Sequence, residues 1–187
     1  MKTNIAIFAS GGGSNAEKII EYFKTSSKGV VALIITNNPT ALVIERAKNH
    51  GIPYYVHSKE DAENGNLLDL LKNHVIGFIV LAGYLKKIPD SLITSYPKKI
   101  INIHPALLPK FGGIGMYGMN VHKAVVAAKE NKSGITIHYV NENYDEGNII
   151  EQHQCLLSVN VMTPESVQER VLALEHRYFA PCIERLL

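Results

Sequence analysis

The chain has 187 residues, of which 46% are hydrophobic and 19% charged, and its mean hydropathy is close to zero. This size and balance predict one globular domain, 1–187, and exclude both a disordered chain and a membrane bundle. Nineteen basic and seventeen acidic residues leave a net charge of +2, without the basic excess that is typical of proteins that bind nucleic acid or membranes. Two cysteines without a CxxC motif, and a start that does not resemble a leader peptide, favour a cytoplasmic protein.

The first half of the chain alternates short β-branched runs with segments of helical period. Strands are expected at 4–10, 30–37, 53–57, 78–83 and 99–104, and helices at 15–24, 41–50, 67–74 and 89–96. Parallel strands joined by helical crossovers form a doubly wound sheet with flanking helices.

The second half of the chain has a different pattern. Residues 110–120 contain four glycines and no periodicity, which predicts a surface loop before a helix at 121–129. Strands at 133–140 and 148–157 flank a turn rich in Asn, Asp and Gly, so we expect an antiparallel hairpin. Thr163, Pro164 and Glu165 are typical of a helix start. The predicted fold is therefore α/β, with a doubly wound, mostly parallel sheet and a C-terminal antiparallel hairpin.

A glycine-rich turn, 10–16, lies between the first strand and the first helix. Backbone N–H groups and the helix dipole favour an anion at such a turn. Gly11, Gly13 and Ala16 satisfy the dinucleotide pattern, but the second strand ends in 36–38, Thr-Asn-Asn, without the acid that binds a ribose. A Gly-Lys-Ser/Thr triphosphate loop is also absent from the sequence. A phosphate monoester fits better, and a tight turn that only lets the helix pack on the strand is the alternative.

Asn102 and His104 are two residues apart on the fifth strand, so both side chains point to one face at its carboxyl end. Asp145 lies in the turn of the predicted hairpin, after a strand that carries Thr136 and His138. We expect a carboxylate near His104 to raise its pKa and hold it protonated. An amide and an imidazolium can donate to the oxyanion of an acyl transfer, and a carboxylate can accept the proton of an attacking amine. Hydrogen-bonded caps under a loop are the alternative for Asn102 and His104.

Five segments together resemble the folate-dependent formyltransferase family, in order and over almost the whole chain. They are SGGGSN at 10–15, VLAGY at 80–84, INIHPALLPKFGG at 101–113, HYVNENYDEGNII at 138–150 and EHRYFAP at 175–181. The resemblance implies a Rossmann-like enzyme of purine biosynthesis and one-carbon metabolism. It implies transfer of the formyl group of 10-formyltetrahydrofolate to the amine of glycinamide ribonucleotide, by direct amine attack through a tetrahedral intermediate. It also implies small-molecule substrates, and we expect a monomer or homodimer. The eight histidines include no HxxxH or HExxH motif, so no metal is expected, and the charge balance predicts no nucleic-acid or membrane partner.

The resemblance assigns residues by position. The catalytic residues would be Asn102, His104 and Asp145, and the ribonucleotide would contact Gly11, Gly12, Gly13, Ser14, Asn15 and Glu175. The folate would contact Lys59, Leu81, Tyr84, Leu85, Lys86, Ile88, Leu108, Val140, Asn141, Glu142, Asn143 and Tyr144. For Leu81 and Leu108, ordinary core packing is the alternative. Lys59 and Lys86 stand where relatives commonly carry arginine, and the loop at 111–119 is longer than the family's usual form.

Two other family activities and one different class are the alternatives. A tRNA-formylating enzyme would resemble this domain followed by a basic RNA-binding domain, and a formyl-folate hydrolase would carry an extra N-terminal regulatory domain. The chain's length and its net charge of +2 count against the first, and a glycine loop that begins ten residues from the start counts against the second. A nucleotide-sensing module could use the glycine loop without chemistry, and would not need the catalytic residues.

Overall fold

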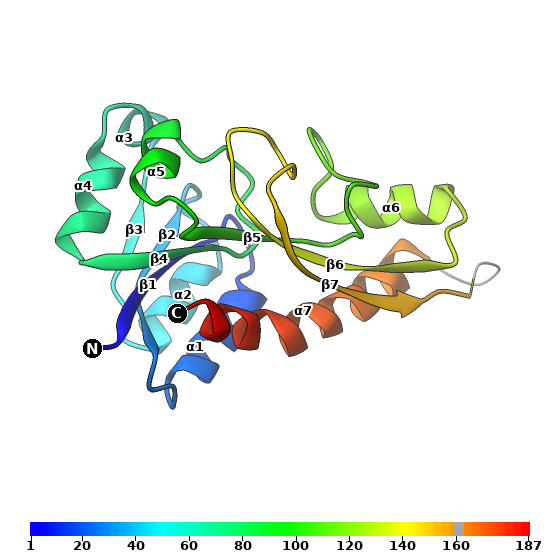
Figure 1. The fold of residues 1–187 in the computed structure, drawn as a ribbon, viewed down its shortest axis with the longest axis horizontal. Helices are drawn as coiled ribbons and strands as arrows, with labels where there is room; N and C mark the ends of the chain where they lie inside the picture. Colours follow the sequence, from blue (N-terminus) through cyan, green and yellow to red (C-terminus); the bar gives the residue numbers. More distant parts are fainter. Residues whose placement is uncertain (159–162) are drawn as a thin grey trace. The chain divides into compact units, whose positions relative to one another are not determined.

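The structure, a computed structural model, describes residues 1–158 and 163–187. In these residues seven strands form one sheet in the order β3-β2-β1-β4-β5-β6-β7 (Figure 1). The strands are β1 (Thr3–Phe8), β2 (Gly29–Thr36), β3 (Tyr54–Val56), β4 (Ile76–Leu81), β5 (Ile100–His104), β6 (Lys132–Tyr139) and β7 (Ile149–Leu156). The helices are α1 (Ser14–Phe23), α2 (Val43–Asn49), α3 (Lys59–Glu63), α4 (Asn66–Asn73), α5 (Asp90–Ser95), α6 (Met119–Ala127) and α7 (Pro164–Leu186).

The chain divides into two compact units, which are Met1–Ile101 with Ala180–Leu187, and Asn102–Phe179. The prediction of one domain stays a prediction. In the first unit β1 pairs in parallel with β2 and β4, and β2 pairs in parallel with β3. Ile5, Ile7 and Phe8 of β1 are fully buried, because helices cover both faces of a parallel sheet. Figure 1 shows α1 and α2 on one side of these strands and α3, α4 and α5 on the other. The predicted doubly wound arrangement is confirmed.

Helix α3 is the element that the sequence analysis missed. Ser58 caps it, since its side chain accepts from the Asp61 backbone N–H and its own N–H donates to the Asp61 carboxylate. Hydrogen bonds to the Asp61 carboxylate lower its pKa to about 2, and they come first from the Ser58 backbone N–H and then from the side chains of Asn66 and Ser58. The spacing Ser58-x-x-Asp61 is the signal that could have identified the helix.

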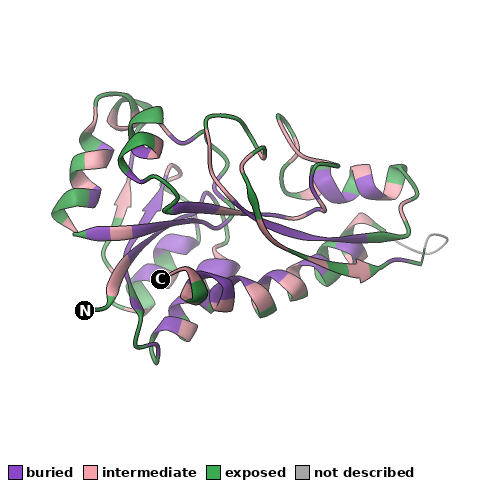
Figure 2. Cartoon of the chain, viewed as in Figure 1, coloured by how far each residue is buried: buried purple, intermediate pink, exposed green. Residues whose placement is uncertain are grey.

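The second unit is built on the hairpin of β6 and β7. The two strands are antiparallel, with Thr136 opposite Gln152 and Gly134 opposite Gln154. Figure 1 shows α6 and α7 on opposite sides of the hairpin, and Figure 2 shows β6 more deeply buried than the edge strand β7. The predicted hairpin and mostly parallel sheet are therefore confirmed.

The long last helix starts as predicted. The N–H of Ser166 donates to the Thr163 hydroxyl at 3.2 Å, and Pro164 is the first helical residue. None of the helices in the described parts of the chain is both long and apolar enough to cross a membrane.

Candidate active site

The predicted catalytic residues lie together in the second unit. Asn102 and His104 end strand β5, and Asp145 follows β6 in the turn of the hairpin. The Asp145 carboxylate lies 3.4 Å from His104 Nδ1 through Oδ2, and 3.5 Å from Asn102 Nδ2 through Oδ1. Chain segments more than 40 residues apart thus place an amide, an imidazole and a carboxylate in one cluster, as the alternation on β5 and the family resemblance together predicted.

Backbone geometry fixes the Asp145 carboxylate. Its φ of 58° lies in the left-handed region, which Asp tolerates better than most residues. The N–H of Gly113 donates to Oδ2 at 2.9 Å. A Cβ at Gly112 would lie 2.5 Å from Leu108 Cδ2 and 3.3 Å from Asp145 Cβ, so a larger residue here would have to displace the Leu108 side chain and would crowd Asp145. The loop after β5 therefore helps to build the site.

His138 is the functional neighbour that received no role from the sequence. Its Nδ1 lies 2.9 Å from the carbonyl oxygen of Tyr139, which can only accept, so Nδ1 carries the proton. In the neutral ring Nε2 is then an acceptor, and it lies 3.1 Å from Asn102 Nδ2 and 3.6 Å from Asp145 Oδ1. Asn102 therefore donates to His138 with one N–H and makes a long contact to Asp145 with the other. The position of His138 on β6, two residues from Thr136 on the same face, is the signal that could have placed it here.

The sequence prediction about the charge of His104 is wrong for the ligand-free protein. The side chain is 3% exposed, and burial lowers its pKa by more than the Asp145 charge and the Phe111 carbonyl raise it. Burial therefore shifts His104 toward the neutral imidazole. Its Nε2 lies 2.8 Å from the Phe111 carbonyl oxygen, so Nε2 carries the proton and Nδ1 faces the carboxylate.

Asp145 remains ionised in this environment. Burial alone would raise its pKa, but the protonated forms of His138 and His104, and then the Gly113 N–H, favour the carboxylate and together lower its pKa below the usual value. Near neutral pH the cluster thus contains a fixed carboxylate beside an imidazole that can take up a proton.

Another buried histidine, His122, lies on α6. It is 3% exposed, and its Nδ1 has no hydrogen-bond partner among the described residues. Burial lowers its pKa, and the charge of His104 lowers it further. His122 has no distinctive signal in the sequence, because a lone histidine within a helical apolar pattern is typical of ordinary packing.

The glycine loop lies in the first unit at the start of α1. Gly13 has φ 69° and precedes the first helical residue, while Gly11 and Gly12 are exposed with open space around them. Arg46 Nε donates to the Gly12 carbonyl at 2.7 Å, and Val43 N–H donates to the Gly11 carbonyl at 3.2 Å. Helix α2 thus holds the loop carbonyls, which leaves accessible backbone at a helix N-terminus.

The other predicted binding residues differ in exposure. Buried positions are Leu81, Tyr84, Ile88, Leu108, Asn15 and Glu175, and half-buried ones are Ser14, Val140 and Asn141. Exposed positions are Lys59, Leu85, Lys86, Glu142, Asn143 and Tyr144. In the first unit His57 Nδ1–H donates to the Ser58 carbonyl, so Nε2 is the acceptor nitrogen of the neutral ring. The Tyr84 hydroxyl therefore donates to His57 Nε2 at 2.8 Å. Leu81 and Leu108 have the burial expected of core residues, and contact with folate stays a prediction for the whole set.

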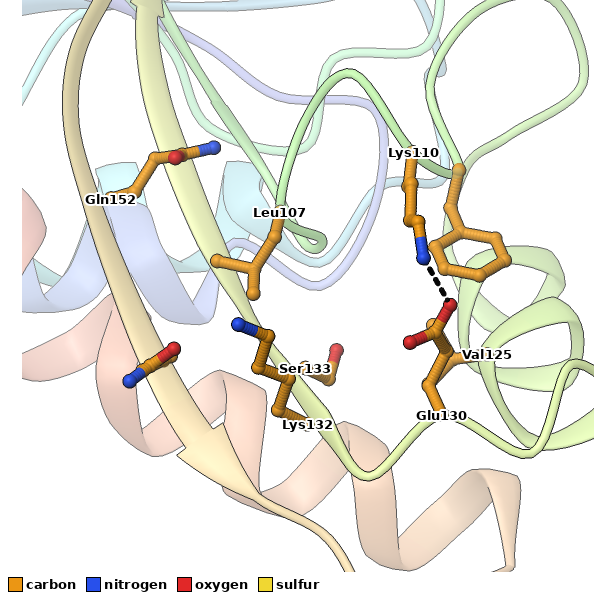
Figure 3. Close-up of a pocket in the computed structure, with 9 residues that line it drawn as sticks. Leu107, Lys110, Val125, Glu130, Lys132, Ser133 and Gln152 are labelled. Atoms are coloured by element: carbon orange, nitrogen blue, oxygen red, sulfur yellow. Dashed lines mark hydrogen bonds and ion pairs between the residues drawn. The ribbon is translucent and has the colours of Figure 1, made fainter.

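A cavity of about 540 Å³ also lies in the second unit (Figure 3). Its walls come from the loop after β5, α6 and the hairpin, and they are Leu107, Lys110, Phe111, Val125, Glu130, Lys132, Ser133, Gln152 and Gln154. Lys110 pairs with Glu130 across it at 2.8 Å. It includes none of the residues predicted to bind substrate. The described residues contain no cluster of His, Cys, Asp or Glu that could hold a metal ion.

The fold and the cluster define the class of protein once they are compared with known families. Residues 3–183 match the formyl transferase family model. The chain therefore belongs to the formyl transferase family.

Within that family, the chain is similar to phosphoribosylglycinamide formyltransferases. It is 44% identical to the chloroplastic enzyme of Arabidopsis thaliana, over 99% of this chain and 67% of that protein, and 38% identical to the Bacillus subtilis enzyme, over 97% and 93%. It spans 61% of the relative from Vigna unguiculata. The crystal structure of glycinamide ribonucleotide transformylase 1 from Geobacillus kaustophilus superposes with a TM-score of 0.91 at 34% identity, over the full length of both chains.

Proposed function

We propose that the chain transfers the formyl group of 10-formyltetrahydrofolate to the amine of glycinamide ribonucleotide. The observation that carries the proposal is the cluster of Asn102, His104 and Asp145 in a chain that matches the formyl transferase family over 3–183. The names of relatives that match nearly its whole length support the choice of substrate.

The proposed reaction begins with attack of the substrate amine on the formyl carbon. A C–N bond forms, the carbonyl electron pair moves onto oxygen, and the amine nitrogen becomes positive. Asp145 is the ionised group that accepts the amine proton, directly or through one water. Collapse of the tetrahedral intermediate restores the carbonyl and breaks the bond to N10 of the folate, which leaves with a proton.

The oxyanion needs hydrogen-bond donors while it exists. Asn102 can supply one donor if the N–H that makes the 3.5 Å contact with Asp145 turns to the oxyanion instead. That contact is longer than the bond from Asn102 to His138, so it is the one that is more easily broken. His104 is neutral before the reaction, but a negative oxygen beside it raises its pKa and favours the imidazolium. We therefore propose that His104 becomes protonated as the oxyanion forms, and not beforehand.

Binding roles are proposed for the remaining residues. Gly11, Gly12, Gly13, Ser14 and Asn15 would hold the phosphate of the ribonucleotide, because exposed backbone at the start of a ten-residue helix favours an anion.

Buried Glu175 would accept from the ribose hydroxyls. The predicted folate residues would form the apolar walls and polar rim of the pterin site.

The reaction would take place in the cytoplasm, as a bacterial relative suggests, although the plant relatives are named as chloroplastic.

The experiment follows labelled formyl groups. The protein is incubated with labelled 10-formyltetrahydrofolate and glycinamide ribonucleotide, with formyl-acceptor tRNA, or with no acceptor. Label in formylglycinamide ribonucleotide alone supports the proposal. Label mainly in free formate without acceptor would indicate a hydrolase, and label in tRNA would indicate the tRNA enzyme. An inactive protein that binds the ribonucleotide would indicate a sensing module.

A further inference from the structure

Side chains of the hairpin hold the backbone that follows His104. The Thr136 hydroxyl donates to the Ala106 carbonyl at 2.7 Å and accepts from the Leu108 N–H at 3.0 Å. Gln152 Nε2 donates to the Leu108 carbonyl and to the Thr136 hydroxyl, both at 2.9 Å. A hydroxyl can donate one hydrogen bond and accept two, so the capacity of Thr136 is fully used.

Strand register places these two side chains together. Thr136 and Gln152 are directly opposite each other in the antiparallel pair, so they lie on the same face of the hairpin. Thr136 is fully buried, while Gln152 lies on the more exposed edge strand. Figure 3 shows Gln152 and Leu107 on the wall of the same cavity. The network thus connects a substitutable surface position to a buried segment of the active-site loop.

The segment held by this network leads to the partner of His104. Phe111, three residues after Leu108, supplies the carbonyl that accepts from His104 Nε2–H at 2.8 Å. The path of 106–111 therefore sets where that carbonyl lies, and with it the direction of the imidazole ring. When Nε2 is bound to Phe111, Nδ1 faces the Asp145 carboxylate.

We infer that Thr136 and Gln152 are positioning residues for formyl transfer, which hold segment 106–111 so that His104 keeps both of its partners. The inference rests on the proposed role of His104. Neither side chain has a contact with the imidazole among the described residues, so both act through the loop backbone.

The test compares four variants of the full chain. Gln152→Leu and Thr136→Val remove hydrogen bonds with little change in volume, and Thr136→Ser keeps the hydroxyl. Gln154→Leu is the matched control, because Gln154 lies two residues along β7 on the same face and lines the same cavity. Among the described residues Gln154 makes no hydrogen bond to the segment.

We expect Gln152→Leu and Thr136→Val to lower kcat by between about tenfold and a hundredfold, because small misplacements of a catalytic group are costly. KM for both substrates should change by less than about threefold, since the residues proposed to bind the substrates are unchanged. Thr136→Ser and Gln154→Leu should stay within about twofold of the wild type.

A second readout separates positioning from a loss of stability. The titration of the His104 imidazole is followed by NMR in the wild type and in Gln152→Leu. The Phe111 carbonyl raises the pKa of His104, so a displaced carbonyl should lower that pKa further. The other groups that face His104 are Asp145, His138 and His122, and they are unchanged in the variant.

Two results would overturn the inference. One is kcat for Gln152→Leu equal to that for Gln154→Leu, and the other is a loss of kcat with an unchanged His104 titration. His104→Ala is measured in parallel. If that variant keeps wild-type formyl transfer, the proposed role of His104 is wrong, whereas a wild type without formyl transfer would refute the proposed function. If His104→Ala is inactive while Gln152→Leu is fully active, only the positioning role is wrong.

Discussion

Substitution of Gly13 by alanine tests the geometry of the glycine loop. The residue has φ 69°, and a Cβ there would lie 2.7 Å from Val43 Cγ2 and 2.8 Å from Val43 Cβ. A left-handed alanine costs about 1–2 kcal/mol, and a contact below 3 Å costs about 1–3 kcal/mol through forced shifts. The sum is about 2–5 kcal/mol, or roughly 4–20 °C in Tm for a chain of this size.

Gly51→Ala is the matched control. Gly51 also has positive φ, at 64°, but a Cβ there would meet open space. The free energy of unfolding of Gly51→Ala should therefore fall only by the backbone contribution of about 1–2 kcal/mol. The double variant Gly13→Ala with Val43→Ala removes the Cγ2 contact and leaves the Cβ contact at 2.8 Å, so the coupling energy should be favourable by only about 0.5–1 kcal/mol.

The assay is thermal unfolding together with steady-state kinetics. We expect Gly13→Ala to raise KM for glycinamide ribonucleotide by about tenfold or more, because the loop backbone can no longer approach the phosphate. KM for the folate should change little. Equal increases in both KM values, or a Gly13→Ala Tm equal to that of Gly51→Ala, would refute the reasoning.

Two further predictions concern ligand binding and pH. A folate analogue without a transferable formyl group should raise Tm through mass action, whereas NAD should leave it unchanged. The reverse result would restore the dinucleotide interpretation of the glycine loop. Burial lowers the pKa of His122, so its contribution to stability is fully present above the unfolded value of about 6.5 and is lost as pH falls toward the folded value. Between pH 7.5 and 5.5, Tm should therefore fall less in His122→Gln than in the wild type, and parallel curves would contradict this.

Periodicity was sufficient to predict most of the fold. The alternation of β-branched runs and helical segments is strong because strands buried on both faces exclude polar residues, as in β1. Helix α3 was missed because its five residues bury no side chain and leave no apolar period, so only the cap at Ser58 marks it. Local hydrogen bonding, and not burial, defines that helix.

The active-site cluster could be predicted in part. Spacing on β5 was enough to place Asn102 and His104 on one face, and the resemblance to the family added Asp145. The charge of His104 was not predictable, since it depends on how far burial outweighs the nearby carboxylate. The Phe111 carbonyl and the Gly113 N–H are backbone groups, and their contributions depend on the loop path and not on residue type.

The most direct test of the account is the activity of Asp145→Asn. Asparagine keeps the shape of the side chain but cannot accept the amine proton, and it removes the charge that favours imidazolium at His104. We expect kcat for formyl transfer to fall by about 10²–10⁴-fold, with folate-analogue binding and folding retained. Activity within a few-fold of the wild type, in a variant that is folded and binds the analogue, would contradict the assignment of Asp145 as the proton acceptor.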